Sequence, residues 1–274
     1  MHQPIYLVPC DFSPIFESAL RLGIDLAEYN KGSVMIIHII SKKSEKLEAK
    51  QKMKKVINAL NENDKTYVDY RILIGDLYED IAKASEILNV SLIVMGTHGA
   101  KGMQKLMGSH ALKLVNSTSS PFMITHGHKY IEKMKNIVMP FCFEKDSLQV
   151  AVFAANIAKQ FNSKIHLVGY KDKDEILKSK TKSNQNILRG FFNEQKVEVV
   201  LVNLDTNAKY EQSLIEYAKE IDADLFAATF FNTTLIPGMN GFVQSLIEND
   251  FDIPLLTVNA EELGISSVSS VMIG

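Results

Sequence analysis

The chain has 274 residues, of which 46% are hydrophobic and 23% are charged, and its formal net charge is −2. This composition is typical of a globular chain with one large domain or two domains of ordinary size. The charge gives no bulk electrostatic reason to bind nucleic acid or an anionic membrane surface, and no run of about 18 apolar residues could span a membrane, so we expect neither as a partner.

Strand-like and helix-like segments alternate from the N-terminus onward. Residues 5–8 form a short apolar run that predicts a buried strand. Ser13-Pro14 then supplies an N-cap followed by proline at the first helical position, and apolar residues recur at helical spacing until Asn30-Lys31-Gly32. Residues 34–40 are apolar on both faces, as a strand of a parallel sheet requires.

A lysine-rich segment at 44–61 also contains glutamates. We interpret it as a solvated amphipathic helix with Leu47, Val56 and Leu60 on its apolar side, and not as a nucleic-acid patch. Further along the chain, up to residue 125, the pattern predicts a strand at 67–74, a helix capped by Asp76 and running to Leu88, and strands at 91–95 and 121–125.

The second half of the chain repeats the first. The step from Gly108 to Pro121 is 13 residues, and the same step separates Gly241 from Pro254, at an offset of 133 residues. Pro9 has its counterpart 131 residues later. A period of this length indicates duplicated domains. The elements also recur, with strands predicted at 137–139, 165–168, 197–202, 224–228 and 254–258 and helices at 148–161 and 214–221.

A polar stretch at 126–133 interrupts the strand pattern. We therefore expect one domain at 1–128, a linker at 129–136 and a second domain at 137–274. Strands that alternate with helices predict an α/β fold, in which parallel sheets with right-handed crossovers are covered by helices on both faces.

The stretch from Gly96 to Ser109 leaves an apolar strand and opens a helix. Its glycines allow close approach of a ligand to the main chain, and a helix start offers free N–H groups to an anion, so a phosphate-bearing ligand is the first hypothesis. The alternative is a turn that uses glycine only to reverse the chain. The stretch lacks the Gly-Lys-Ser/Thr ending of a P-loop.

Asp11 stands after the first strand, as Gly96 stands at the end of the fourth. In parallel sheets ligands bind beyond the carboxyl ends of the strands, where the strand order reverses. If the first and fourth strands are neighbours, Asp11 can accept hydrogen bonds from a ribose or a base while the glycine loop takes phosphates. The alternative for Asp11 is an ordinary turn or capping role.

Four segments in this order and spacing resemble the universal stress protein family: residues 8–13, residues 94–99, Gly108-Ser109 and Ser120-Pro121-Phe122. Two such domains in tandem would cover nearly all of the chain. The resemblance implies in each half a doubly wound, five-stranded parallel sheet of order 3-2-1-4-5, like that of the adenine nucleotide alpha hydrolases. It also implies ATP, a ligand of many members, at the switch point, where Mg²⁺ can accompany the phosphates.

The resemblance implies that Asp11 and the main chain around Ile39 hold the adenosine end, and that the glycine loop lines the phosphates. The implied nucleotide-binding set is Pro9, Asp11, Ile39, Met95, Gly96, His98, Gly99, Gly108, Ser109 and His110. Eight residues separate Gly99 from Gly108, one fewer than in the family pattern, and the second half keeps the same 12-residue step from the fourth strand to Gly241.

The second half lacks this set. Thr229, Asn232 and Phe242 stand in place of Gly96, Gly99 and Ser109, and Cys142 or a neighbour stands in place of Asp11. We therefore predict one nucleotide site, in the N-terminal domain. The degenerate domain is expected to be a packing partner or to hold a less charged ligand, with packing favoured, among Phe230, Phe231, Met239 and Phe242.

No arrangement of serine, histidine and acid, no partnered carboxylates and no metal-ligand spacing is readable, so a dedicated enzyme receives little support; slow ATP hydrolysis stays open. We expect a nucleotide-binding stress-response or signalling module. The alternative is a nucleotide-free scaffold for dimerisation and interaction, because the fifth strands are expected to be sheet edges. The resemblance implies that these edges pair within the chain as a pseudo-dimer, and a homodimer is a further option.

Cys10 and Cys142 each follow an apolar run that is expected to be a buried strand. Two isolated cysteines favour a reducing compartment over a disulfide framework. Residues 1–8 show no basic region followed by a long apolar segment. We therefore expect a cytoplasmic location.

Overall fold

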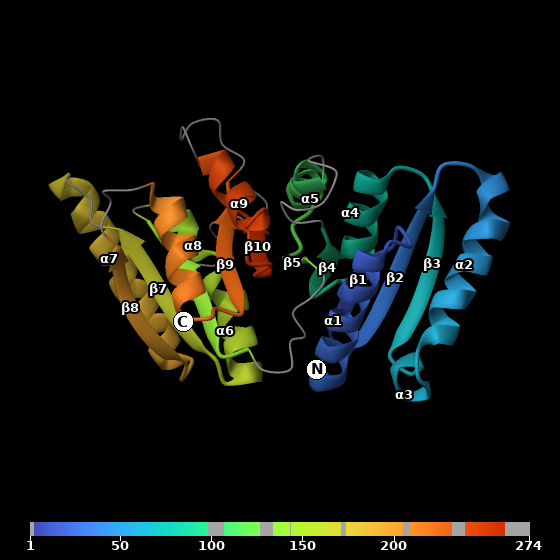
Figure 1. The fold of residues 1–274 in the computed structure, drawn as a ribbon, viewed down its shortest axis with the longest axis horizontal. Coiled ribbons are helices and arrows are strands. Elements are labelled where there is room, and N and C mark those ends of the chain that lie inside the picture. The colour runs from blue at the N-terminus through green and yellow to red at the C-terminus, as the bar shows by residue number, and fades with distance from the viewer. Residues whose placement is uncertain are drawn as a thin grey trace. The chain divides into compact units, whose positions relative to one another are not determined.

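The computed structural model describes residues 3–97, 107–126, 134–142, 144–170, 174–204, 209–231 and 239–260, with only the backbone at 107–110, 146 and 239–240. The chain divides into two compact units, one holding the first five strands and the other the last five (Figure 1). The strand pairs within each unit are parallel. Within the described ranges, no helix combines the length and apolar character that a membrane span needs.

The first unit places its strands in the order β3-β2-β1-β4-β5. Its strands are β1 (Ile5–Pro9), β2 (Ser33–Ile40), β3 (Val68–Ile74), β4 (Leu92–Gly96) and β5 (Phe122–Thr125). Its helices are α1 (Pro14–Asn30), α2 (Lys46–Ala59), α3 (Glu62–Lys65), α4 (Leu77–Ile87) and α5 (Met107–Asn116), with a 3₁₀ turn η1 (Lys43–Glu45). The order confirms the expected doubly wound sheet. The chain leaves β1 toward β2 and later returns to β4, so the strand order reverses between β1 and β4.

Local sequence signals fix the ends of α1, as predicted. The Ser13 hydroxyl accepts the Phe16 N–H at 3.2 Å, and proline occupies the first helical position. The helix ends where Lys31 adopts a left-handed conformation with φ of 53°. Because its apolar residues recur at helical spacing, one face is buried, with Phe16, Ala19 and Leu26 at 2% exposure or less, and it packs against β1, β2 and β4.

The lysine-rich segment is a helix as predicted, but its buried face differs from the prediction. Leu47, expected on the apolar side, is 70% exposed. Ala49 and Met53 are the buried residues of α2. The prediction was wrong because it weighted large apolar residues, whereas the spacing from Ala49 through Met53 to Val56 and Leu60 follows the helical period more closely.

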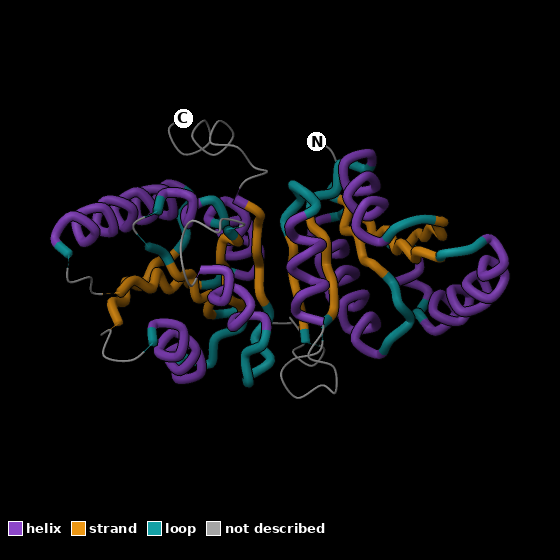
Figure 2. Tube along the Cα trace, turned by 90° about the horizontal axis from the view of Figure 1, so that it is seen from above, coloured by secondary structure: helices purple, strands orange, loops and turns teal. Residues whose placement is uncertain are grey.

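The second unit has the same order, β8-β7-β6-β9-β10. Its strands are β6 (Asn136–Pro140), β7 (Lys164–Tyr170), β8 (Glu198–Leu204), β9 (Leu225–Phe230) and β10 (Leu255–Asn259). Its helices are α6 (Ala151–Phe161), α7 (Glu175–Glu194), α8 (Tyr210–Glu220) and α9 (Met239–Ile247), with a 3₁₀ turn η2 (Lys145–Leu148). Seen from above, helices lie on both sides of the strands in each unit (Figure 2).

The repeat is preserved down to single backbone conformations. Lys31 and Asn162 both end a helix with φ of 53°, at the offset of 131. Asn89 and Asp222 have φ of 49° and 50°, at the offset of 133. The offset grows because the connection from β8 to α8 is longer than the one from β3 to α4. Most of the expected linker at 129–136 falls outside the described residues, and β6 begins at Asn136.

We predict that His166, on β7, makes the stability of the second unit depend on pH. Its ring nitrogens lie 2.7 Å from the Tyr217 hydroxyl and 3.3 Å from the Asn136 amide oxygen. Burial, and secondly the Lys164 ammonium, lower the pKa of His166. The unfolded chain, with a histidine pKa of about 6.5, therefore binds a proton more readily than the folded chain does, and stability decreases as the pH falls below that value.

Urea unfolding at pH 7.5 and pH 5.5 measures this effect. The loss of unfolding free energy between the two pH values should be smaller in His166→Gln than in the unchanged protein. An equal loss in both would contradict the assignment to His166.

Candidate functional site

The carboxyl ends of β1, β2 and β4 lie at one edge of the first sheet. Pro9 pairs with Ile37, and Leu7 pairs with Ile93, so β1 stands between β2 and β4. This register brings five of the ten predicted residues to the point where the strand order reverses: Pro9, Asp11, Ile39, Met95 and Gly96. The sequence-based expectation that Asp11 and Gly96 follow neighbouring strands is thus confirmed.

The residues at this edge are partly exposed to solvent, whereas most of the residues earlier in the same strands are buried. The middle residues of β1 and the first three of β4 are buried. The residues at the carboxyl edge are partly exposed, and Asp11 is in the exposed class. A parallel sheet covered on both faces normally buries its strands, so the exposure at this end indicates a place that a ligand can reach.

A tight turn after β1 fixes the Asp11 side chain. Its Oδ1 atom accepts the Ser13 N–H at 2.9 Å, which closes an Asx turn. Phe12, between them, has φ of 60°, a left-handed conformation that non-glycine residues adopt rarely. Within the described part of the chain, this N–H is the one donor to the carboxylate, so Asp11 retains acceptor capacity at the open edge.

Two neighbours of this turn, His38 and Lys52, were not predicted. His38 Nδ1 lies 2.6 Å from the Cys10 carbonyl oxygen, and its ring lies 4.4 Å from that of Phe12. The Lys52 ammonium stands 5.8 Å from the centre of the Phe12 ring. The signal for His38 was a single polar residue near the end of an otherwise apolar strand.

Burial raises the pKa of the Cys10 thiol to about 12, so Cys10 is not a reactive thiolate at neutral pH.

Gly96 has a packing reason to be glycine. A Cβ atom at this position would lie 2.6 Å from the Ile15 carbonyl oxygen and would also collide with the Ile15 side chain. The first turn of α1 therefore rests directly on the end of β4. This contact explains Gly96 independently of any ligand.

The phosphate side of the predicted site is only partly described. His98 and Gly99 lie outside the described residues. Gly108, Ser109 and His110 lie in the first turn of α5, where the backbone alone is described. Their helical position agrees with the prediction that a helix opens at Gly108. The role of all five toward a ligand stays a prediction.

At the boundary between β6 and β9, the same edge of the second unit is closed. Cys142 stands at the position of Asp11 and is 9% exposed, and Thr229 stands at the position of Gly96 and is 4% exposed. The end of β6 and all six residues of β9 are buried. The two units therefore share a fold but differ in access at the switch point.

Thr229 changes how the first helix of the second unit begins. Its hydroxyl donates to the Ser147 carbonyl oxygen and accepts the Val150 N–H, both at 3.3 Å. In the first unit, Ile15 fills the space beside Gly96, which has no side chain. In the second unit, the Thr229 side chain takes the equivalent space. In agreement, α6 begins only at Ala151, after the separate turn η2. The residue that corresponds to the start of α1 lies six residues earlier. The predicted start at residue 148 was too early for this reason.

Aromatic side chains fill the place of the glycine loop in the second unit. Phe242, at the position of Ser109, stacks on Tyr210 with ring centres 5.9 Å apart and planes 13° apart. The Tyr210 hydroxyl donates to the Val168 carbonyl oxygen at 2.8 Å, which fixes the stack. Phe230 and Phe231 are buried at 6% and 9% exposure, which agrees with the packing role that the sequence favoured.

The fold and the open edge define a class of protein: a doubly wound α/β domain with an accessible switch point, present in two copies of which one is closed. Residues 5–126 match the model of the universal stress protein family. This match covers most of the first unit, which therefore carries a universal stress protein domain.

Three single proteins are similar to all or part of this chain. Universal stress protein A homolog 1 of Coxiella burnetii is 25% identical over 132 residues, which covers 40% of this chain and 88% of the relative. A universal stress protein from Archaeoglobus fulgidus DSM 4304 superposes with a TM-score of 0.74 at 16% identity and covers 95% of this chain and 100% of that chain, so the same fold extends over both units. A further Archaeoglobus fulgidus universal stress protein, solved in complex with dAMP, is 18% identical and covers 45% of this chain and 97% of that chain, with a TM-score of 0.37.

We predict that Gly96→Ala destabilises the first unit by about 1–3 kcal/mol, because the added methyl group must displace the backbone of Ile15. Gly190→Ala, in the middle of α7, is the matched control. Nothing lies within 4 Å of a Cβ there, so this change should stabilise by about 0.5–1 kcal/mol. Denaturant unfolding of both variants measures the difference. A Gly96→Ala protein as stable as the parent would show that the contact with Ile15 is loose.

Proposed function

We propose that this chain binds ATP, or a related adenine nucleotide, at the carboxyl ends of β1, β2 and β4 and acts as a stress-response or signalling module. The bound nucleotide shifts the affinity of the first unit for a partner, and the second unit holds no second nucleotide. Chemistry on the nucleotide is at most slow hydrolysis.

The observation that carries the proposal is the difference between the two switch points. In the first unit Asp11 is exposed and the strand ends are partly open. In the second unit Cys142 and Thr229, which hold the positions of Asp11 and Gly96, are buried, and Phe242 stacks on Tyr210 where the glycine-led helix stands in the first. A duplicated fold that keeps one edge open and polar while the other has filled with apolar side chains supports a ligand role for the open edge.

The residues present fit a nucleotide. The free acceptor capacity of Asp11 suits ribose hydroxyl groups, which are hydrogen-bond donors. The partly exposed Ile39 offers an apolar surface to a base. The first turn of α5 carries backbone N–H groups without intrahelical partners, and Gly108 and Ser109 stand in that turn, so it suits phosphate oxygens. Mg²⁺, bound through the phosphates and water, would neutralise part of their charge.

Native mass spectrometry of freshly purified protein, followed by calorimetric titration with MgATP and with MgGTP, tests the proposal. We expect one ATP per chain, a dissociation constant in the micromolar range or below, and weaker binding of GTP. A protein that carries no nucleotide and shows no heat of ATP binding would favour the nucleotide-free scaffold.

We predict that Gly108→Val abolishes ATP binding, because a branched side chain in the first turn of α5 blocks the approach of phosphate to the backbone. Gly241→Val is the matched control, since Gly241 holds the equivalent position in the second unit and nothing lies within 4 Å of a Cβ there. It should bind ATP as the parent does. The same loss in both variants would indicate a general effect of valine on the fold.

Asp11→Asn tests the ribose contact separately. It keeps the shape and the Asx turn but turns one acceptor into a donor, so we expect ATP affinity to fall about tenfold, as for the loss of one hydrogen bond to a charged group. Inorganic triphosphate, which has no ribose, should bind the variant and the parent equally. An equal loss for both ligands would place Asp11 near the phosphates.

A further inference from the structure

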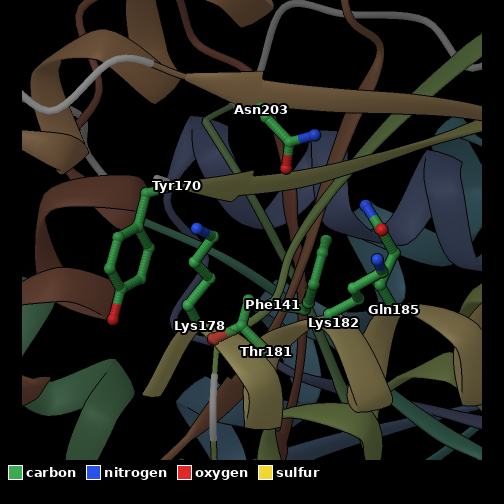
Figure 3. Close-up of a pocket in the computed structure, with 7 residues that line it drawn as sticks. All are labelled: Phe141, Tyr170, Lys178, Thr181, Lys182, Gln185 and Asn203. Atoms are coloured by element: carbon green, nitrogen blue, oxygen red, sulfur yellow. The ribbon is translucent and has the colours of Figure 1, made fainter. Parts of the chain in front are cut away.

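The second unit holds a cavity of about 440 Å³ between α7 and the carboxyl ends of β6, β7 and β8 (Figure 3). This volume is in the range of small-molecule sites. The cavity lies on the β7–β8 side of the sheet, whereas the counterpart of the proposed nucleotide site extends from β7 across β6 to β9. Tyr170, the counterpart of Ile39, is the one cavity-lining residue among the positions equivalent to the predicted nucleotide set.

In the first unit, side chains occupy the corresponding place. His38 holds the position of Gly169, and its ring packs on Phe12 and contacts the Cys10 carbonyl oxygen. In the second unit the missing side chain at Gly169 leaves room for the Phe141 ring, whose Cζ atom would lie 2.9 Å from a Cβ there. The side chains around this position therefore differ between the two units.

Two aromatic rings give the cavity an apolar wall. Phe141 follows β6 and is 2% exposed, so it is held in place by the core. Tyr170 ends β7, and its ring lies 5.3 Å from the buried ring of Tyr210. Flat, rigid rings of this kind favour a ligand with a planar apolar body.

Thr181 stands on the wall of this space that α7 provides. Thr181 lines the cavity and is 7% exposed, and its Oγ1 atom has no hydrogen-bond partner within the described part of the chain. A buried hydroxyl without a partner costs free energy, so its presence points to a group that completes it. One turn later the Asn184 amide donates to the Cys142 carbonyl oxygen at 2.8 Å, which fixes this wall of the cavity.

The charge of the lining is positive. Lys178 and Lys182 stand on α7, and none of the described residues that line the cavity is acidic. Figure 3 shows the Lys178 side chain rising from the helix between Tyr170 and Phe141, with the Asn203 amide opposite on β8. Glu175 pairs with Lys178 at 3.1 Å, but both side chains are largely exposed, so this pair is weak and can exchange for another anion.

We propose that this cavity binds a small organic anion with a planar apolar body, of the class of aromatic carboxylates. The ring of the ligand packs against Phe141 and Tyr170, and its carboxylate accepts hydrogen bonds from Thr181 and from the ammonium groups of Lys178 and Lys182. The chain then has two ligand sites of different chemistry, one in each unit.

Three probes of equal shape and different charge test the proposal: 2-naphthoate, neutral 2-naphthamide and the cation 2-naphthylmethylammonium. Each is titrated into the full chain and followed by two-dimensional ¹H–¹⁵N NMR. We expect 2-naphthoate to bind with a dissociation constant on the order of 1 mM or below, as for a ligand of this size. The amide should bind at least fivefold more weakly and the cation not measurably, with shifts confined to α7 and the ends of β6 to β8.

Two variants and a matched control locate the site. Lys178→Ala combined with Lys182→Ala should weaken 2-naphthoate binding at least tenfold and leave 2-naphthamide binding within twofold. Thr181→Val, which removes the hydroxyl at nearly constant volume, should weaken 2-naphthoate at least threefold. Lys180→Ala is the control, because Lys180 is an exposed lysine of the same helix that does not line the cavity.

Equal binding of all three probes, equal loss in the Lys180→Ala control, shifts outside the second unit, or no binding of 2-naphthoate at 10 mM would each overturn the proposal. None of these outcomes bears on ATP, which is titrated into the same samples. ATP shifts confined to the first unit would leave the proposed function intact, and ATP shifts at α7 would contradict both proposals.

Discussion

The contact between Gly96 and Ile15 governs how the first unit presents its open edge. Because residue 96 has no side chain, the first turn of α1 rests on the end of β4, and the helix starts five residues after β1. The chain between them is too short for anything but a tight turn, and that turn carries Asp11 at the surface. Gly96 therefore helps to place Asp11 at the surface, because it lets α1 pack closely against β4.

The second unit shows the effect of releasing this constraint. Thr229 replaces the glycine, its hydroxyl holds a separate turn, and α6 starts later. Aromatic rings then cover the switch point, the Phe141 ring packs beside Gly169, and a cavity lies between α7 and the ends of β6 to β8. The two units share one fold, but the end of the strand pair β1–β4 is partly exposed in the first unit, whereas its counterpart β6–β9 is buried in the second.

The sequence predicted the helices and strands correctly wherever a local signal determines where they begin and end. Ser13-Pro14 and Asn30-Lys31-Gly32 bound α1, and the apolar runs mark the strands to within one or two residues. Helix α7 was missed because Thr181 and Asn184 stand at its buried positions and break the apolar period, so the cavity beside it was missed as well. The contact of Gly96 with Ile15 joins residues far apart in the chain, and no local pattern reports such a contact.

The stack of Phe242 on Tyr210 has a consequence for how the chain responds to its ligand. A protein with two equivalent sites can couple them, so that the first ligand alters the affinity for the second. Under the function that we propose, the aromatic rings of the second unit leave one nucleotide site in each chain. Occupancy of a single chain by ATP should therefore rise with concentration as a simple hyperbola with a Hill coefficient of about 1, and any steeper response would have to arise between chains.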